Sequence, residues 1–323
     1  MKRIAVLTSG GDAPGMNAAI CAVVEQGTRQ GLEVYGVYNG FKGLYDGDFK
    51  RLTVGDCQDK VRRGGTFLYS ARFPEFKDPE VRLKAIEQLK KHEIDGLVVV
   101  GGDGSFTGAL KLTEHGFPAI GIPGTIDNDI PGTEYSIGFD TAVNVALDAV
   151  DKITDTASSH NRTFVIEVMG RHAGDMATWI GIAAGADAIV IPEAPFTMEE
   201  VIRAVEIGRQ RGKDHGLILL AEGVMSGRQF RKEYEAMTDD EIRDVQLSHI
   251  QRGGTPTIRD RAWATMMGAY AVDLLVDGQA GLYVGVKGEQ LAKFDIVDTL
   301  QNVKHQVRLD LYERNKKFKD IKK

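Results

Sequence analysis

Two aspartates that flank a single asparagine, Asp127 and Asp129, carry the sharpest chemical signal in this sequence. They belong to the segment Pro123–Asp129, directly after an apolar run with the character of a strand. Two carboxylates this close repel each other unless a cation or a proton compensates. A general base and a metal-linked acid are the natural division of labour for phosphoryl transfer to a hydroxyl. An isolated Asp-Asn-Asp is more typical of a surface turn, so the segment indicates chemistry only alongside other motifs.

Two glycine-rich turns could hold phosphate groups. The first, Thr8–Asn17, lies between a strand-like and a helix-like stretch, and its glycines let backbone N–H groups approach a phosphate. It matches neither the Walker A loop nor the G-x-G-x-x-G fingerprint, and a tight strand-to-helix turn explains it equally well. The second, Val100–Ser105, places Asp103 among glycines, which suits a polyphosphate that carries Mg²⁺. A plain turn is the alternative there, but an acid inside a glycine loop favours function.

Arginines scattered along the chain could bind phosphate groups through two parallel hydrogen bonds. Each of them alone is more typical of a surface charge or an ion pair. His249 alone is likewise more typical of a polar surface or core histidine than of a catalyst. The candidates are Arg72, Arg162, Arg171, Arg243 and Arg252.

Short apolar, β-branched runs are predicted to be the strands that position these motifs. Their nearly continuous hydrophobicity is typical of strands covered on both faces, as in a parallel sheet. Ligands bind at the carboxyl ends of such strands, and the glycines of this sequence cluster there. The predicted strands are Ile4–Leu7, Gly96–Val100, Ala119–Ile122, Phe164–Val168, Ala188–Ile191 and Leu217–Leu220.

Amphipathic stretches between the strands are predicted to be helices. They include Glu80–Lys91 and a helix capped by Thr197 that runs to about Arg211. The pair Thr238 and Glu241 repeats the capping signature and predicts another helical stretch before His249. A long helix is expected from Arg259 to Asp277, stopped by Gly278. The alternation of strands and helices predicts stacked α/β layers with a mainly parallel sheet.

Composition limits the class of protein. The chain has 323 residues, of which 42% are hydrophobic and 27% charged, which suggests two globular domains. A net charge of −6 argues mildly against nucleic-acid binding. Cys21 and Cys57 lack a metal-like spacing and are expected to be reduced thiols. The basic run Asn315–Lys323 is expected to be a solvated tail. Without a signal-peptide core or a membrane-length apolar run, a soluble, cytoplasmic protein is expected.

Taken together, the motifs resemble those of the ATP-dependent 6-phosphofructokinase family. The resemblance covers nearly the whole chain and implies two three-layer α/β domains with mainly parallel sheets. Residues 1–138 plus 252–305 would form an ATP-binding domain, and 139–251 plus 306–323 a sugar-phosphate-binding domain. The matching motifs are Ser9–Asn17, Arg63–Phe76, Gly101–Ser105, Pro123–Asp129, Glu167–Arg171 and His249–Gly254.

The resemblance implies roles around the reacting groups. Asp127 is implied as the general base for the 1-hydroxyl of fructose 6-phosphate, with Thr125 as its neighbour. Arg171 and Arg72 are implied as cations that steady the transferring phosphoryl group, and Gly11 as a backbone donor near the β- and γ-phosphates. Asp103 and Asp129 are implied to be linked to Mg²⁺. The implied ATP-binding residues are Gly11, Arg72, Phe73, Gly102, Asp103, Gly104, Ser105 and Gly108.

The resemblance also implies a shared sugar-phosphate site. Arg162 and Arg243 would reach the 6-phosphate from a neighbouring subunit, so a homotetramer with shared active sites is implied. The remaining implied contacts come from one subunit: Thr125, Asp127, Met169, Gly170, Arg171, Glu222, His249 and Arg252.

Two glycines bear on the phosphoryl donor. In pyrophosphate-dependent relatives the position of Gly104 is usually Asp and that of Gly124 is usually Lys. Bulk at the first position would obstruct the α-phosphate of a nucleotide, so the two glycines favour ATP.

An effector site is implied as well, because bacterial members of the family often bind ADP or phosphoenolpyruvate between subunits. Arg211, Lys213, His215 and Asp59 match part of that pocket. Cys21, Glu25 and Thr154 replace the usual arginines, however, and Asp187 replaces a glutamate. Losing several cations should weaken anion binding, so weak or altered allosteric control is expected.

Other functions stay open at this level. A pyrophosphate-dependent enzyme, or a kinase for another phosphosugar, would share most of these motifs. A nucleotide sensor without catalysis should lack the base or the metal-linked acids, and a passive structural subunit would tolerate their loss. Because Asp127, Asp129 and Asp103 are all present, the catalytic interpretation is favoured over both.

Overall fold

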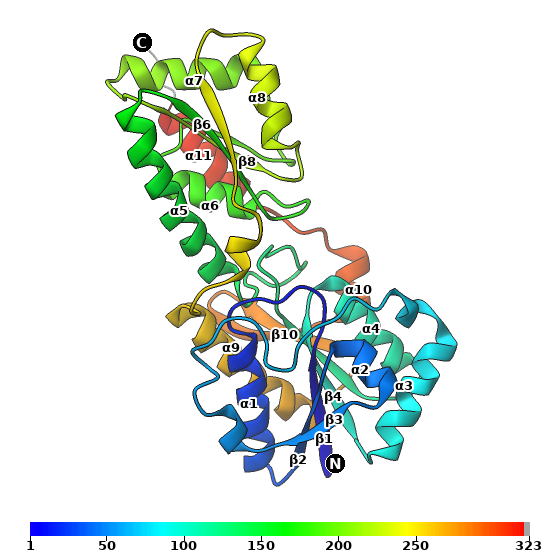
Figure 1. Cartoon of the computed structure of the whole chain (residues 1–323). Helices are drawn as coiled ribbons and strands as arrows, with labels where there is room; N and C mark the ends of the chain where they lie inside the picture. The colour runs from blue at the N-terminus through cyan, green and yellow to red at the C-terminus, as the bar shows by residue number, and fades with distance from the viewer. Residues whose placement is uncertain (320–323) are drawn as a thin grey trace. The chain divides into compact units, whose positions relative to one another are not determined.

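The computed structural model describes residues 1–319 and contains two compact units (Figure 1). Each unit has its own mainly parallel sheet with helices on its faces, so the predicted α/β fold is confirmed. Residues 320–323 of the predicted segment 306–323 lie outside the described residues. Unit 1 comprises Met1–Ile126, Ile130–Thr141 and Arg252–His305; unit 2 comprises Asp127–Asp129, Ala142–Gln251 and the chain from Gln306 onward.

The sheet of unit 1, as far as the described residues show, has seven strands in the order β11-β10-β5-β4-β1-β2-β3. The five central strands run parallel, and the two edge strands pair antiparallel. The strands are β1 (Arg3–Thr8), β2 (Glu33–Val37), β3 (Phe49–Leu52), β4 (Gly96–Gly101), β5 (Ala119–Pro123), β10 (Leu282–Lys287) and β11 (Gln290–Asp295).

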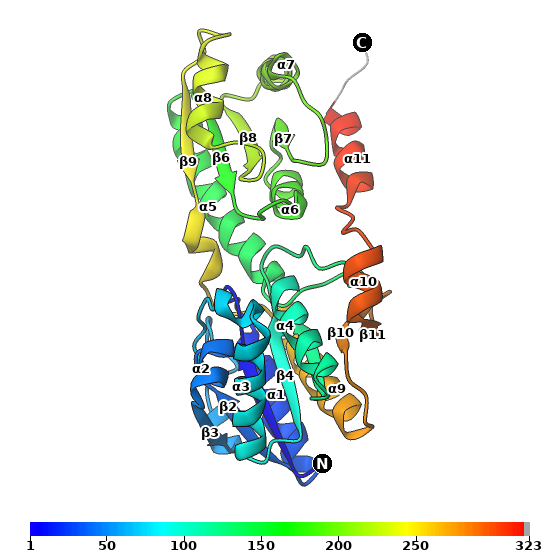
Figure 2. The same ribbon diagram turned by 90° about the vertical axis from the view of Figure 1, so that its right-hand side faces the viewer.

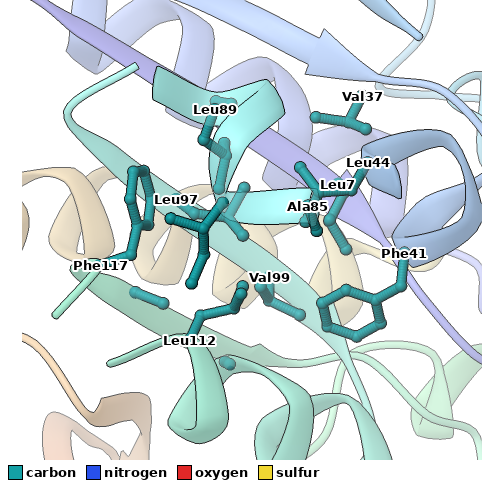
Figure 3. Packing of buried hydrophobic residues seen from close by; sticks show 14 of the residues in the cluster. Leu7, Val37, Phe41, Leu44, Ala85, Leu89, Leu97, Val99, Leu112 and Phe117 are labelled. Atoms are coloured by element: carbon teal, nitrogen blue, oxygen red, sulfur yellow. The ribbon is translucent and has the colours of Figure 1, made fainter. Parts of the chain in front are cut away.

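One face of this sheet is covered by α2, α3 and α4. Because strand side chains alternate between faces, Leu7 of β1 and Leu97 and Val99 of β4 point the same way and meet the helices in one apolar core (Figure 3). Phe41 of α2 and Leu112 of α4 complete this packing. The helices are α2 (Gly40–Asp46), α3 (Pro79–Lys91) and α4 (Asp103–Glu114); α10 (Ile296–Asn302) also belongs to unit 1.

The opposite face is covered by α1 (Met16–Arg29) and α9 (Ile258–Val276), which pack against each other (Figures 1 and 2). Gly268 permits this close approach, since a Cβ there would lie 2.6 Å from the backbone oxygen of Ala19. Helix α9 stops before Gly278, whose φ of 74° is the left-handed conformation that ends helices. The predicted helix from 259 to 277 is thereby confirmed.

Unit 2 is built on a parallel sheet of four described strands in the order β7-β8-β6-β9. Val201 and Val205 of α7 and Phe230 of α8 pack on one face, and α6 packs on the other, where Gly181 lies against Ile189. The elements are β6 (Thr163–Val168), β7 (Ala188–Val190), β8 (Gly216–Ala221), β9 (Ile242–Gln246), α6 (Asp175–Ala183), α7 (Met198–Gln210), α8 (Gly227–Glu235), α11 (Leu309–Lys319) and α5 (Phe139–Ser159), whose first three residues belong to unit 1.

The helix predicted at Thr238 is wrong. The Thr238 hydroxyl instead accepts the N–H of Asp240, 2.8 Å away, in a local turn. Asp240 then receives an ion pair from Arg209 at 2.6 Å and a hydrogen bond from the Thr163 hydroxyl at 2.6 Å. These contacts lead the chain into β9, so His249 follows a strand and lies in the 3₁₀ turn η3 (Ser248–Arg252). The capping helix predicted at Thr197 is confirmed as α7, with Thr197 accepting the N–H of Glu200.

The basic run from Asn315, expected to be a solvated tail, forms the end of helix α11 as far as Lys319, and its residues 316–318 are exposed. Helix α11 packs on unit 2 and buries Tyr312, whose hydroxyl donates to the backbone oxygen of Ile189 at 3.3 Å. Residues 320–323 of that tail lie outside the described residues. Among residues 1–319, no helix combines the length and apolarity needed to cross a membrane.

Candidate active site

Three turns lie side by side at the carboxyl edge of the unit 1 sheet. The register pairs Thr8 of β1 with Val100 of β4, and Gly101 with Pro123 of β5. The backbone N–H of Ser9 donates to Val100 at 2.9 Å, which fastens the first turn to the second. The sheet therefore gathers the two glycine turns and the segment that leads to Asp127, although they are far apart in sequence.

The glycines of these turns serve two different purposes. At Gly101 a Cβ would lie 2.4 Å from the Ser105 hydroxyl and 2.6 Å from the Ser9 backbone oxygen, so only glycine fits. At Gly102 and Gly104 a Cβ would meet nothing within 4 Å. The exposed backbone at the start of α4, beside exposed Asp103, is thus accessible to a ligand at the positive end of a helix.

Gly11 lies against Arg252 within unit 1. A Cβ at Gly11 would come within 2.5 Å of the Arg252 guanidinium, which donates to the backbone oxygen of Asp12 at 3.1 Å. Arg252, predicted for the sugar phosphate, therefore lies beside the first glycine turn.

The predicted ATP-binding pair Arg72 and Phe73 is held near the same turn. The Ser70 hydroxyl donates to the Gly10 backbone oxygen at 2.6 Å and fixes the segment that leads to the pair. Arg72 is exposed, and the Phe73 ring lies 5.6 Å from that of Tyr45. Gly108 is buried inside α4, where a Cβ would lie 2.7 Å from the Phe41 ring, so the structure shows a packing role for it.

Asp127 and Arg171 form the central ion pair of the candidate site. The Arg171 Nε lies 3.2 Å from the Asp127 Oδ2, and the Asp127 side chain is 1% exposed while that of Arg171 is 52% exposed. Asn128 has a φ of 53°, a left-handed conformation that asparagine tolerates well. The carboxylate is thus buried against a cation that still reaches solvent.

Arg171 has an unusual backbone conformation, which is held by a carboxylate that follows the neighbouring strand β8. Its φ is 52°, left-handed for a residue with a long side chain. Glu222, which follows β8, accepts the N–H of Arg171 at 2.9 Å and that of Gly170 at 3.2 Å. Buried Gln251 accepts the N–H of Met169 at 3.0 Å. Gln251 lies inside the motif His249–Gly254 but had no role predicted from sequence; its position next to Arg252 was the available signal.

Arg162 and Arg243 lie at the opposite end of β6. Arg162 directly precedes Thr163, and Arg243 directly follows Ile242, the residue paired with Thr163. Both guanidinium groups form ion pairs with Glu241. At the usual rise per residue, Arg162 is about 20 Å from Met169 at the carboxyl end of the strand. Within one chain the structure therefore does not bring these two arginines to Arg171. His249 is exposed in η3.

Asp260, which lies outside every predicted motif, holds in place the chain that follows β5. This fully buried carboxylate accepts the Tyr135 hydroxyl at 2.5 Å, the Gly138 N–H at 2.6 Å and the Thr141 N–H at 2.8 Å. Burial raises the pKa of Asp260, and the hydrogen bonds from Thr141 and Tyr135 oppose that rise. The segment 124–141 is fixed at its far end by this one side chain.

Asp103 is one of the two residues implied for a Mg²⁺ ion that a nucleotide carries. Within residues 1–319, no cluster of three or more metal-binding side chains is present. Mg²⁺ often takes only one or two carboxylates together with phosphate oxygens. Exposed Asp103, with its oxygen also accepting the N–H of Gly104 at 2.7 Å, has the right chemistry and position for that.

The implied effector residues fall into two groups. Cys21, Glu25 and Asp59 belong to unit 1, and the others belong to unit 2. Thr154 lies in α5, where its hydroxyl donates to the Val150 backbone oxygen, and His215 contacts Asp214 at 2.7 Å.

A cavity of 320 Å³ in unit 2 is lined by Asp187, Arg211 and Lys213, together with residues of α7 and α11. Lys213 pairs with Asp187 at 2.7 Å, and Arg211 donates to the backbone oxygen of Lys319. Burial, followed by nearby Lys213, lowers the pKa of Lys319. Arg211 and Lys213 are therefore already engaged by groups of the same chain.

Comparison with known proteins agrees with this architecture. The profile of the family described as Phosphofructokinase matches residues 3–275. ATP-dependent 6-phosphofructokinase of Enterococcus faecalis is 59% identical over 315 residues, which cover 98% of each chain. The enzyme of the same name from Halalkalibacterium halodurans is 58% identical over 97% of this chain and 98% of its own. The chain belongs to the phosphofructokinase family.

Solved structures agree with the fold. Phosphofructokinase from Saccharomyces cerevisiae superimposes with a TM-score of 0.90 at 32% identity, over 98% of this chain and 50% of the yeast chain. This chain thus spans half the length of that relative. The pyrophosphate-dependent enzyme of Marinobacter aquaeolei has a TM-score of 0.82 at 22% identity, over 95% of this chain and 86% of its own, which shows the shared fold alone.

Proposed function

We propose that this protein is a glycolytic enzyme that transfers the γ-phosphate of ATP to the 1-hydroxyl of fructose 6-phosphate, giving fructose 1,6-bisphosphate and ADP. The names of its close full-length relatives support this reaction. The observation that carries the proposal is the buried Asp127 carboxylate, 3.2 Å from Arg171 and directly after a strand whose neighbours end in glycine turns. Its place of action is the cytoplasm.

Asp127 acts as the general base in this proposal. It accepts the proton of the sugar hydroxyl, while Arg171 and Arg72 balance the charge that spreads over the transferring phosphoryl group. Phosphoryl transfer needs little covalent help from the protein, so holding the two substrates in line supplies much of the rate. The hydrogen bond that the Arg171 backbone N–H donates to Glu222 supports such positioning because it holds the arginine beside the base.

ATP is assigned to the carboxyl edge of unit 1, and the sugar phosphate to the strand ends of unit 2. Gly11 and the start of α4 supply backbone donors, and Asp103 with Asp129 would hold Mg²⁺ once the nucleotide brings it. The metal would neutralise charge on the phosphate oxygens. Thr125 is assigned to the sugar beside Asp127.

ATP is preferred over pyrophosphate as the donor. The space around Gly104 is open, with nothing within 4 Å of a would-be Cβ, which leaves room for the α-phosphate of a nucleotide. At Gly124 a Cβ would lie 2.9 Å from Val100, so a lysine there would require a local rearrangement.

Active sites shared within a homotetramer are part of the proposal. Arg162 and Arg243 form a pair of cations at the amino end of β6, remote from Met169 in the same chain. A neighbouring subunit could supply such a pair to the 6-phosphate.

Allosteric control by ADP and phosphoenolpyruvate is proposed to be weak or altered. Lys213 is already paired with Asp187, and Cys21 and Glu25 offer no positive charge. Strong inhibition by submillimolar phosphoenolpyruvate in a steady-state assay would refute this.

Steady-state formation of fructose 1,6-bisphosphate, with either ATP or pyrophosphate as donor and Mg²⁺ present, tests the reaction and the donor together. Turnover with ATP is expected. Turnover with pyrophosphate alone would assign the chain to the pyrophosphate-dependent enzymes. No turnover with either donor would favour a nucleotide sensor.

A further inference from the structure

The only two cysteines of the sequence lie together in unit 1, although 36 residues separate them. Cys21 is in the second turn of α1, and Cys57 is the last residue of the 3₁₀ turn η1 (Val54–Cys57). Both are free thiols, 1% and 5% exposed. The Cys21 Sγ lies 3.8 Å from the backbone oxygen of Cys57, and the two thiol groups also interact with each other.

The two thiols differ in acidity. The hydrogen bond from Cys21 holds the pKa of Cys57 below its ordinary value, against the effect of burial. The same hydrogen bond and burial raise the pKa of Cys21. Because the thiolate is the reactive form of cysteine, one of the two thiols must lose its proton before the pair can react.

The same face of α1 contacts both ends of the segment 57–67. Asn17, one helical turn before Cys21, donates to the Arg63 backbone oxygen at 3.0 Å and accepts the Phe67 N–H at 2.8 Å. Cys21 contacts the start of the segment, and Asn17 its end. The residues just after Cys57, Gln58 and Asp59, are exposed, so a local opening of this loop is enough to admit a small oxidant.

We propose that Cys21 and Cys57 are a reversible oxidation site, at which an intramolecular disulfide ties η1 to α1. Hydrogen peroxide oxidises the thiolate of one of the two cysteines to a sulfenic acid and is itself reduced to hydroxide. The thiol of the other cysteine then attacks the sulfenic sulfur, a sulfur–sulfur bond forms, and the oxygen leaves as water with the thiol proton. A dithiol reductant reverses the change by thiol–disulfide exchange. Such a transient disulfide is compatible with an otherwise reducing compartment.

Fixing Cys57 to α1 should stiffen the loop that begins there. The loop continues through Arg63, whose backbone oxygen accepts a hydrogen bond from Asn17, and leads to Arg72 and Phe73. Backbone N–H groups between 58 and 66 are therefore expected to exchange more slowly with solvent in the oxidised protein than in the reduced protein.

The test treats the folded full-length protein with a small excess of hydrogen peroxide and counts thiols after denaturation. Both thiols should disappear together, with a mass loss of two hydrogen atoms and a peptide that links Cys21 to Cys57. Dithiothreitol should restore both thiols and the faster hydrogen exchange at 58–66. Cys21→Ser and Cys57→Ser, the matched controls, should each leave a chain that forms no internal disulfide.

Three results would overturn the proposal. The first is that both thiols survive the treatment. The second is that one cysteine is driven to the sulfinic acid while its partner stays reduced. The third is that disulfides form between chains instead of within one chain. The thiol count and the linked peptide come from the natural sequence, so the test stands even where a serine variant folds poorly.

Discussion

The two ends of the parallel strands in unit 1 use their polar groups in opposite ways. At the amino end, Arg3 pairs with Glu33 at 2.7 Å and with Glu93, and Asp95 accepts the N–H groups of Lys2 and Arg3. At the carboxyl end, glycines replace side chains, and the backbone at the start of α4 is open to solvent. One end satisfies its groups internally, and the other leaves donors for a ligand.

Substitutions at the amino end should therefore affect stability, and substitutions at the carboxyl end should affect chemistry. The carboxyl end is not uniformly open, because Asp260 braces the segment that follows β5. The Ile137 N–H donates to the Pro123 backbone oxygen at 2.9 Å and transmits that support to the strand end. The loop after β5 therefore contains both residues that stabilise the fold and residues of the candidate active site, whereas the two ends of the sheet keep these two kinds of residue apart.

The largest change in stability is expected from Asp260→Asn. The amide would keep one acceptor oxygen and turn an NH₂ group toward donors that now bind the second oxygen. Leaving buried donors unsatisfied costs about 1–3 kcal/mol each, so unfolding should become easier by about 3 kcal/mol. Denaturant unfolding measures this. Thr28→Ala, which removes a single hydroxyl bonded within its own helix α1, is a control expected to change little. An unchanged denaturation midpoint for Asp260→Asn would show that Asp260 does not stabilise the segment after β5.

A smaller, purely kinetic change is expected from Gly104→Asp. Because nothing lies within 4 Å of the Cβ position, the fold should accept the side chain with little loss of stability. The new carboxylate would repel the α-phosphate of ATP and lower kcat/KM for ATP by about 10-fold or more, since like charges in contact cost several kcal/mol. Gly104→Ala is the matched control, with a milder loss expected. An unchanged kcat/KM in the aspartate variant would show that nucleotide does not pass this residue.

The smallest effect is expected at the amino end, from Asp95→Asn. Partial burial would raise the pKa of Asp95, but the N–H groups of Lys2 and Arg3 outweigh it, and the pKa lies below its ordinary value of 3.8. Its charged form therefore stabilises the fold above that value, and the contribution is lost as the pH falls through the folded pKa. The variant should lose about 0.5–1 kcal/mol at neutral pH, because the site is exposed, and nothing in strong acid. Turnover should stay normal.

A pH-independent loss in Asp95→Asn would contradict the role of the charge. A fall in turnover would contradict the separation of the two ends.

The strands β1, β4 and β5 of unit 1 and β6, β7 and β8 of unit 2 could be predicted from sequence because they are nearly continuous apolar runs. The strands β2, β3, β9, β10 and β11 escaped prediction because polar residues or glycines interrupt them. Strand β3 reads Phe49-Lys50-Arg51-Leu52, and only its ends are apolar, so its charged residues resemble a loop. Its pairing with β2, which no local pattern encodes, makes it a strand.

Site residues followed the same division. The motifs after β1, β4, β5 and β6 were predictable because glycines and acids mark strand ends. Asp260 and Gln251 were not, because their roles depend on partners more than a hundred and about eighty residues away, respectively. Thr238 was misassigned because the sequence signature of a helix cap is the same whether or not a helix follows. Here the ion pair between Arg209 and Asp240 accompanies a turn instead.

The role of Asp127 is tested most directly by the kcat of Asp127→Asn with ATP, fructose 6-phosphate and Mg²⁺. A fall in kcat of about 10²–10⁴-fold is expected, with substrate binding retained, because the amide cannot accept the proton. A near-normal kcat would contradict this expectation and would remove Asp127 from the role of general base.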